Sequence, residues 1–311
     1  MSPVIKVSDL TKSFRDVKAV NGLSFTVPSG EIYGFLGQNG AGKSTTIRML
    51  LTLIQPDSGD IEIFGMNLKK HRKQILQNTG AIIERPDLYK YLTARENLKI
   101  FAAISGVKVP AKKIMDQLEM VGLAERANSK VKTYSQGMKQ RLGIAIALVH
   151  NPQLIILDEP TNGLDPQGIA DIRNLILHLS RDLGKTVLVS SHLLSEIELI
   201  ADSMLIIDKG KKIAEGKAAE LFDPAETVVE LKTTDINTTY EKLQQSKWNN
   251  LLVEKKNDAI LLKLHRSQVP VVMKELVLMD IAITSFYSKN SLEDYFLSLT
   301  SANQHVEAFK N

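Results

Sequence analysis

The chain has 311 residues, with 39 lysines and arginines, 35 aspartates and glutamates, and a formal net charge of +4. An apolar share of 43% is sufficient for a folded core, and so weak a positive balance gives no reason to expect a nucleic-acid partner. The absence of cysteine excludes disulfides, zinc–thiolate clusters and thiol chemistry. Because no apolar signal core follows Met1 and no run of about 18 apolar residues occurs, we expect any membrane-spanning part to come from another chain.

The first 222 residues alternate between predicted strands and helices. Apolar runs predict strands at 4–7, 23–27, 31–36, 60–64 and 79–83, with a polar turn between the first two and a helix at 44–53. Three- and four-residue spacing of apolar residues predicts helices at 94–104, 111–121 and 137–150, a helical subdomain over about residues 90–150. Strands at 154–157, 186–190 and 204–208 then alternate with helices at 167–183 and 195–201. This order predicts an α/β fold with a largely parallel sheet.

The pattern changes at about residue 223, which we take as the start of a second domain, 223–311, after a first domain of residues 1–222. Strands at 228–232, 251–255, 260–264 and 281–287 combine with helices at 237–245 and 270–279, and an Asn257-Asp258 turn joins the middle strands. The resulting order βαββαβ predicts a small α+β module of the ferredoxin-like type. A last helix is expected at 292–300.

A phosphate-binding loop is the strongest motif in the chain. Residues 37–44 read G-x-x-x-x-G-K-S between a predicted strand and a predicted helix. The glycines let backbone N–H groups turn toward a polyphosphate, and the helix adds its positive end. Lys43 would reach the β- and γ-phosphates, and the Ser44 hydroxyl would ligate Mg²⁺. The nucleotide contacts we expect from this loop are Gly37, Gln38, Asn39, Gly40, Ala41, Gly42, Lys43, Ser44 and Thr45. The alternative, a glycine-rich turn that matches by chance, does not explain the strand-to-helix context.

Two carboxylates follow the strand at 154–157. In an open α/β sheet ligands bind at the carboxyl ends of the strands, so Asp158 is a candidate Mg²⁺ ligand and Glu159 a candidate base for the attacking water. His192 follows the strand at 186–190, and we expect it beside the same site as a second catalytic group. A purely structural hydrogen-bonding role is the alternative for this histidine.

The order of the motifs identifies a family. Residues 134–142, Tyr-Ser-Gln-Gly-Met-Lys-Gln-Arg-Leu, open a helix with Ser135 as its N-cap, and by spacing alone they would be only a capped amphipathic helix. Together with the phosphate loop, Leu-Asp-Glu-Pro at 157–160, Asn-Gly-Leu-Asp at 162–165 and Ser-His at 191–192, they resemble an ABC-type ATPase domain over residues 4–222, a P-loop NTPase fold.

The resemblance implies that Ser135 and Gly137 bind the γ-phosphate of ATP held by a second ATPase subunit. It places Asp165 at that interface and makes Phe14 the candidate for stacking on adenine, with ordinary packing as the alternative for Phe14. It also implies ATP and Mg²⁺ as cofactors and an integral-membrane permease, encoded separately, as a partner. The ATPase would then lie on the cytoplasmic face of the cell membrane.

Two departures from the family pattern stand out. The signature Leu-Ser-Gly-Gly-Gln is here Tyr-Ser-Gln-Gly-Met at 134–138, and the position of the Q-loop glutamine is Glu84, which would offer Mg²⁺ and the nucleotide a carboxylate. Glu84 and the C-terminal module, with Ser-Leu-Glu-Asp-Tyr-Phe-Leu at 291–297, resemble the ATPases of bacitracin-resistance and lantibiotic-immunity exporters. This subgroup implies export of a drug, an antimicrobial peptide or a lipid-like substrate.

Two other functions remain open from the sequence. A soluble ABC-type ATPase that acts on ribosomes or DNA without a membrane partner is one, although a single phosphate loop and the lack of a heptad run disfavour it. The other is a regulator that binds ATP without turnover, which the presence of Glu159 and His192 disfavours.

Overall fold

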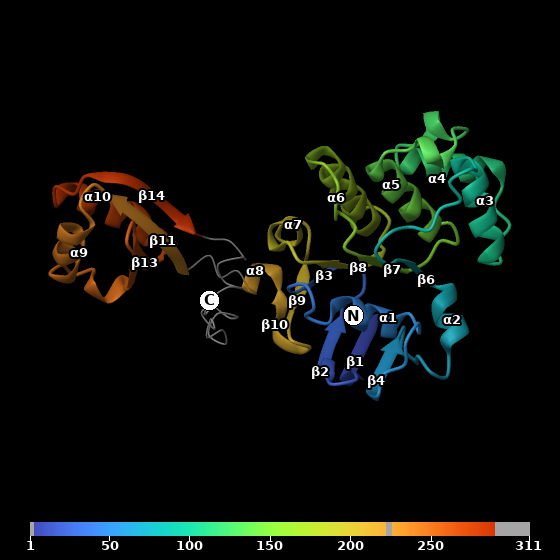
Figure 1. Ribbon diagram of the computed structural model, residues 1–311, viewed down its shortest axis with the longest axis horizontal. Coiled ribbons are helices and arrows are strands. Elements are labelled where there is room, and N and C mark those ends of the chain that lie inside the picture. The colour runs from blue at the N-terminus through green and yellow to red at the C-terminus, as the bar shows by residue number, and fades with distance from the viewer. Residues whose placement is uncertain (1–2, 222–225, 290–311) are drawn as a thin grey trace, which may run out of the picture. The chain divides into compact units, whose positions relative to one another are not determined.

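The computed structural model describes residues 3–221 and 226–289, and contacts divide the chain into two units, Met1–Ala218 and Ala219–Asn311 (Figure 1). The domain boundary that we placed between residues 222 and 223 lies outside the described residues and stays a prediction. The helix expected at 292–300 lies outside them as well.

A six-stranded sheet forms the centre of the first unit. Its strand order is β10-β9-β3-β8-β7-β6, and every neighbouring pair is parallel except the pair that adds the edge strand β10. The strands are β3 (Ile32–Leu36), β6 (Thr79–Ile82), β7 (Leu154–Asp158), β8 (Thr186–Ser191), β9 (Ser203–Asp208) and β10 (Lys211–Lys217). All residues of β3, β7 and β8 are buried, as expected for strands covered on both faces. The predicted, largely parallel sheet is confirmed.

A second, antiparallel sheet has the order β2-β1-β4-β5. Its strands are β1 (Ile5–Phe14), β2 (Val17–Val27), β4 (Ser58–Ile63) and β5 (Met66–Asn67). The polar turn expected between residues 7 and 23 is wrong, because β1 and β2 continue through most of it as a paired ribbon with several register shifts. Polar residues there occupy exposed positions of an antiparallel pair, which leaves one of its faces open to water.

Helices separate and cover the two sheets of the first unit. Figure 1 shows α3, α4, α5 and α6 on one side of the six-stranded sheet, and α1 between that sheet and strands β1, β2 and β4. Ile47, Met49 and Leu50 of α1 share one hydrophobic core with residues of both sheets. The helices are α1 (Lys43–Leu50), α2 (Arg72–Gln77), α3 (Ala94–Ile104), α4 (Ala111–Met120), α5 (Gln136–Ala147), α6 (Pro166–Arg181) and α7 (Leu194–Glu198). The short helix α8 (Ala218–Leu221) begins at the last residue of this unit.

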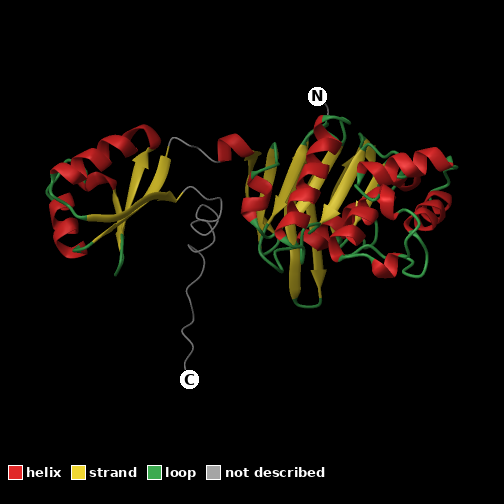
Figure 2. Cartoon of the chain, turned by 90° about the horizontal axis from the view of Figure 1, so that it is seen from above, coloured by secondary structure: helices red, strands yellow, loops and turns green. Residues whose placement is uncertain are grey.

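The second unit contains β11 (Glu226–Thr233), α9 (Ile236–Gln244), β12 (Leu252–Lys255), β13 (Ile260–His265), α10 (Val269–Leu278) and β14 (Ile283–Lys289). Its sheet is antiparallel throughout, in the order β12-β13-β11-β14, and Figure 2 shows its helices on one side of that sheet. Leu243, Trp248 and Leu276 belong to a core that is separate from the core of the first unit. The element order βαββαβ is as predicted, while the ferredoxin-like assignment stays a prediction.

Candidate ATP site

Four loops of the first unit meet at one edge of the six-stranded sheet. Strands β3, β8, β7 and β6 are parallel neighbours in that order, so their carboxyl ends lie side by side. The phosphate loop follows β3, His192 follows β8, Glu159 follows β7 and Glu84 follows β6. The sequence-based expectation that His192 and Glu159 adjoin the phosphate loop is therefore met, at the edge where open α/β sheets bind ligands.

The backbone of the phosphate loop requires glycine at two positions. A Cβ on Gly37 would lie 2.6 Å from the Ile207 carbonyl oxygen. Gly42 has φ of 106°, and a Cβ there would lie 2.4 Å from the carbonyl oxygen of Ala19. No side chain caps the start of α1 after Gly42, so its first N–H groups are left for an anion. Gln38, Asn39 and Gly40 are exposed, so this part of the loop is open to solvent.

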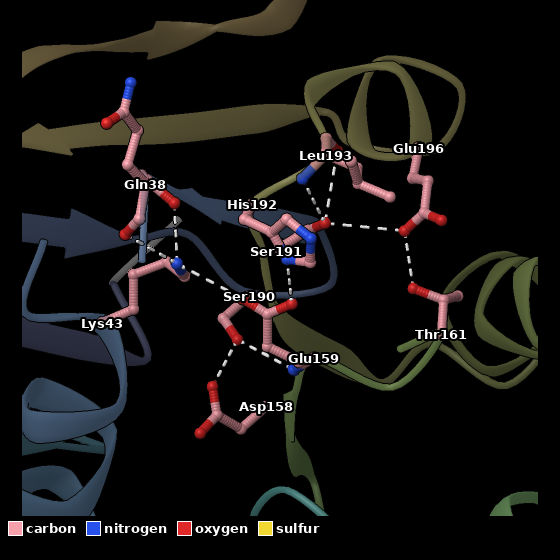
Figure 3. Close-up of polar contacts among 11 residues, drawn as sticks. Gln38, Lys43, Asp158, Glu159, Thr161, Ser190, Ser191, His192, Leu193 and Glu196 are labelled. Atoms are coloured by element: carbon pink, nitrogen blue, oxygen red, sulfur yellow. Dashed lines mark hydrogen bonds and ion pairs between the residues drawn. The ribbon is translucent and has the colours of Figure 1, made fainter. Parts of the chain in front are cut away.

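Lys43 is buried with its charge paired. The side chain is 5% exposed, and its Nζ donates to the Gly37 carbonyl at 2.6 Å and to the Gln38 carbonyl at 3.2 Å. A third partner is Glu159 Oε1, at 3.3 Å (Figure 3). A buried ammonium needs such partners. Phosphate oxygens entering the loop would offer the same charge an anionic partner in place of the carbonyls.

Residues in and just after β8 form hydrogen bonds that hold the acidic end of β7 in place. Glu159 Oε2 accepts from Nδ1 of His192 at 2.5 Å. Ser190, opposite Asp158 in the parallel register, donates from Oγ to Asp158 Oδ1 at 2.5 Å and accepts from the Glu159 backbone N–H at 2.9 Å (Figure 3). One serine therefore holds the Asp158 carboxylate and the Glu159 backbone, which lies in the left-handed region at φ of 49°.

The oxygen ligands present fit a magnesium ion. Asp158 is fully buried, and its Oδ2 has no hydrogen-bond partner, which is costly for a buried carboxylate unless something else binds it. Ser44, at the start of α1, supplies a half-buried hydroxyl. Mg²⁺ is commonly held by one or two protein oxygens together with substrate phosphates and water. No cluster of three or more histidine, aspartate and glutamate side chains suited to a metal occurs within residues 3–221 and 226–289.

The side chain of Glu84 contacts α1. Its Oε1 accepts from Arg48 Nη2 at 2.6 Å, and its backbone has φ of 58°. This contact was not foreseen from the sequence, because Arg48 and Glu84 belong to different elements and only the fold brings them together.

The signature residues form a second cluster. Ser135 caps α5 by accepting from the Met138 N–H at 3.2 Å, and Asp165 caps α6 by accepting from the Gly168 N–H at 2.9 Å. A Cβ on Gly137 would lie 4.0 Å from the Gly168 Cα, so the two helix starts are neighbours. In the described part of the chain, no hydrogen bond or ion pair joins this cluster to the phosphate loop. The predicted contacts thus fall into two separate groups.

Phe14 is the last residue of β1 and lies beside β2, the strand that contacts the phosphate loop. It pairs with Val17 across the β1–β2 hairpin, and the Ala19 carbonyl of the same hairpin approaches Gly42. The ring is 47% exposed, and the ammonium of Lys12 lies 5.4 Å from its centroid. An exposed ring at this position suits stacking on a base.

A further contact that the sequence did not reveal connects the loops after β7 and β8. Thr161 Oγ1 donates to Glu196 Oε2 at 2.5 Å (Figure 3). Ser191 Oγ lies 3.5 Å from the same carboxylate oxygen. Glu196 therefore joins the segment between Glu159 and Asp165 to the segment that carries His192. The motifs at 157–160, 162–165 and 191–192 do not indicate that Thr161 and Glu196 form this contact.

Comparison with known proteins agrees with this geometry. A family model described as "ABC transporter" matches residues 20–162. The bacitracin transport ATP-binding protein BcrA of Bacillus licheniformis is 45% identical over 96% of this chain and 98% of its own length. The chain belongs to the ABC transporter ATP-binding family. Another relative, the lantibiotic transport ATP-binding protein SrtF of Streptococcus pyogenes, is 40% identical over 75% of this chain and 97% of its own length.

Solved structures lead to the same family. The dimeric post-hydrolysis structure of the ATP-binding cassette MJ0796, bound to ADP and Pi, matches with a TM-score of 0.63 at 26% identity, over 69% of this chain and 98% of that one. The protein is thus an ATP-binding and ATP-hydrolysing subunit of an ABC transporter that uses ATP with Mg²⁺. Among the helices of the described ranges, none has the length and apolar character needed to cross a membrane.

Proposed function

We propose that two ATPase subunits enclose two ATP molecules, each between the phosphate loop of one subunit and the signature cluster of the other. The support is the division of the predicted contacts into two groups within one chain. Residues 38–40 of the phosphate loop are open to solvent, and Ser135, Gly137 and Asp165 lie together without a hydrogen bond to the loop within the described residues. Each chain would then supply two complementary halves, and ATP would favour the closed pair.

Each residue at the strand ends would have its own role in ATP hydrolysis. Glu159 would accept the proton of the attacking water, and His192 would fix the orientation of its carboxylate. Lys43 would exchange its carbonyl contacts for phosphate oxygens, and the backbone of residues 37–45 would bind the phosphates. Ser44 and Asp158 would hold Mg²⁺, which neutralises developing charge on the phosphates. Phe14 would stack on adenine.

The permease would dock on the segment that follows β6. This segment exposes two aromatic side chains, Tyr89 at 50% and Tyr91 at 79%, and the helix α3 that follows exposes Ile104 at 68%. A chain bound there would lie on the cytoplasmic face of the cell membrane as a peripheral subunit. Glu84 belongs to the same segment, which would connect docking to the nucleotide site.

The proposed cargo is an antimicrobial peptide or a similar drug, moved by export. One observation carries this proposal: the match to the bacitracin transport protein extends over the second unit and covers 96% of the chain, whereas the match to the lantibiotic transport protein covers 75%. A second bacitracin transport protein, from Enterococcus faecalis, is 38% identical over 96% of the chain and 97% of its own length.

Affinity purification of the tagged chain from solubilised membranes, followed by drug-susceptibility assays, tests the proposal. We expect an integral-membrane protein to co-purify, and co-expression of both chains to raise the inhibitory concentration of bacitracin or a lantibiotic. The Glu159→Gln variant should co-purify equally well without conferring resistance. Recovery of ribosomes or DNA in place of a membrane protein would refute the transporter assignment and favour a soluble ATPase.

A further inference from the structure

The position of Glu84 just after β6 places it near the strand end that carries Asp158, a proposed magnesium ligand. Strands β6 and β7 are parallel neighbours, with Ile82 opposite Leu157. Glu84 follows Ile82 by two residues, and Asp158 follows Leu157 directly. Parallel strands end at the same edge, so Glu84 leaves the sheet beside the aspartate whose Oδ2 has no partner.

Helix α1 approaches the same place from the other side. Ser44 and Arg48 are four residues apart, so they share one face of α1. Arg48 Nη2 lies 2.6 Å from Glu84 Oε1. The helix face that carries the hydroxyl ligand therefore also carries the cation that holds Glu84.

The pair is accessible and exchangeable. The side chain of Arg48 is 44% exposed and that of Glu84 is 64% exposed, and exposed ion pairs of this kind are weak. The backbone of Glu84 lies in the left-handed region at φ of 58°, which is uncommon for a residue other than glycine. Within residues 3–221 and 226–289, neither side chain has another ion pair.

We propose that Arg48 is a positioning residue that holds the Glu84 carboxylate away from the magnesium site, so that metal binding competes with the guanidinium for Glu84. This inference rests on the proposed nucleotide site. The site already contains Asp158 and Glu159, and a third carboxylate raises affinity for a hard cation because affinity depends on ligand charge. Arg48 offsets that charge until the metal–nucleotide complex draws Glu84 away. Arg48 thereby sets the metal concentration at which Glu84, in the loop after β6, exchanges the guanidinium for the metal.

A double-mutant cycle measured by binding tests the inference without relying on turnover. Mn²⁺ is titrated into the purified chain with saturating ADP, and free Mn²⁺ is measured by electron paramagnetic resonance. The proteins are wild type, Arg48→Ala, Glu84→Gln and the double variant. We expect Arg48→Ala to tighten Mn²⁺ binding about fivefold when Glu84 is present, and to change it less than about twofold when Glu84→Gln is already in place.

Arg85 provides the matched control. It is an exposed arginine next to Glu84, and no ion pair involves it in the described ranges. Arg85→Ala removes one positive charge next to Glu84 without removing the Arg48–Glu84 contact, so it should change Mn²⁺ affinity less than about twofold. Tightening of equal size in Arg48→Ala and Arg85→Ala would show a general charge effect and overturn the inference.

The remaining outcomes are also decisive. An equal effect of Arg48→Ala with and without the Glu84→Gln substitution, or no effect in either case, would overturn the inference and leave the proposed function intact. If wild-type protein bound ADP but no Mn²⁺ with it, and chelation of the metal left ADP binding unchanged, the proposed magnesium site at Ser44 and Asp158 would fail, and the inference with it.

Discussion

The carboxylate of Glu159 accepts a hydrogen bond from Nδ1 of His192 at 2.5 Å, across the ends of two adjacent parallel strands. The other carboxylate oxygen lies 3.3 Å from Lys43 Nζ. Glu159 is thus fixed between the strand that carries the histidine and the helix that follows the phosphate loop. As the proposed base, Glu159 would thereby keep its direction toward an attacking water.

Removal of the histidine should slow the chemical step. We expect His192→Ala to lower kcat by roughly 100-fold, because a base displaced by about 1 Å loses that much rate. The KM for ATP should change little, because the phosphate loop is untouched. Steady-state phosphate release at a range of ATP concentrations measures both parameters. An unchanged kcat would exclude a role for His192 in orienting Glu159.

Ser190 should matter for stability and for metal binding. Ser190→Ala leaves Asp158 without the donor to Oδ1, and loss of a partner for a buried group costs about 1–3 kcal/mol of unfolding free energy. We also expect weaker Mn²⁺–ADP binding, since Asp158 loses its fixed direction. Denaturant unfolding and metal titration measure the two effects.

Ser180→Ala is the control for Ser190→Ala. Ser180 is a buried serine of α6 that donates to the neutral carbonyl of Gly30 at 3.1 Å. Its loss should lower stability without changing metal affinity. Equal effects of both variants on metal binding would contradict the role assigned to Ser190.

His150 should make the first unit less stable in mild acid. Its Nδ1 is buried without a partner, its Nε2 lies 3.2 Å from the Thr79 carbonyl, and burial lowers the pKa of His150 below the ordinary 6.5. Between the lowered pKa and 6.5 the unfolded state binds more protons than the folded state, so the unfolding free energy falls as pH falls through this window. Urea unfolding of wild type and His150→Gln from about pH 8 to pH 5 should show a shallower decline in the variant. Parallel curves would contradict this prediction.

The single tryptophan reports on the second unit alone. Trp248 packs in that unit's core, and its Nε1 donates to Glu275 at 2.8 Å. Leu276 is fully buried on α10, and Leu276→Ala should lower the stability of this unit by about 2–5 kcal/mol. Leu278, 74% exposed on the same helix, is the control, and Leu278→Ala should stay within about 0.5 kcal/mol. Tryptophan fluorescence during denaturation measures both variants, and equal losses would contradict the assigned core.

The sequence was sufficient to predict which residues gather at the sheet edge. The phosphate loop, Glu159 and His192 each follow a short apolar strand, and parallel strands bring such ends together whatever their spacing in the chain. The helices at 94–104 and 111–121 were also predicted within one residue of α3 and α4, because their apolar spacing is regular.

The remaining features depend on information that local patterns do not contain. Strands β1 and β2 are long because they pair with each other and with β4, and β5, α2 and β10 were missed because they are short or polar. The contact of Ser190 with Asp158 depends on strand register, and the contact of Arg48 with Glu84 depends on how α1 packs beside the loop after β6. A single sequence specifies neither.

The most direct test of the central claim compares phosphate release and nucleotide binding in wild type and Glu159→Gln. If Glu159 is the base of an ATPase whose site is completed by a second subunit, wild type should release phosphate from Mg–ATP. The variant should then lose turnover, still bind ATP, and elute as a dimer when ATP is present. Equal phosphate release by the two proteins would contradict the assignment of Glu159, and an ATP-bound variant that remained a monomer would contradict the shared site.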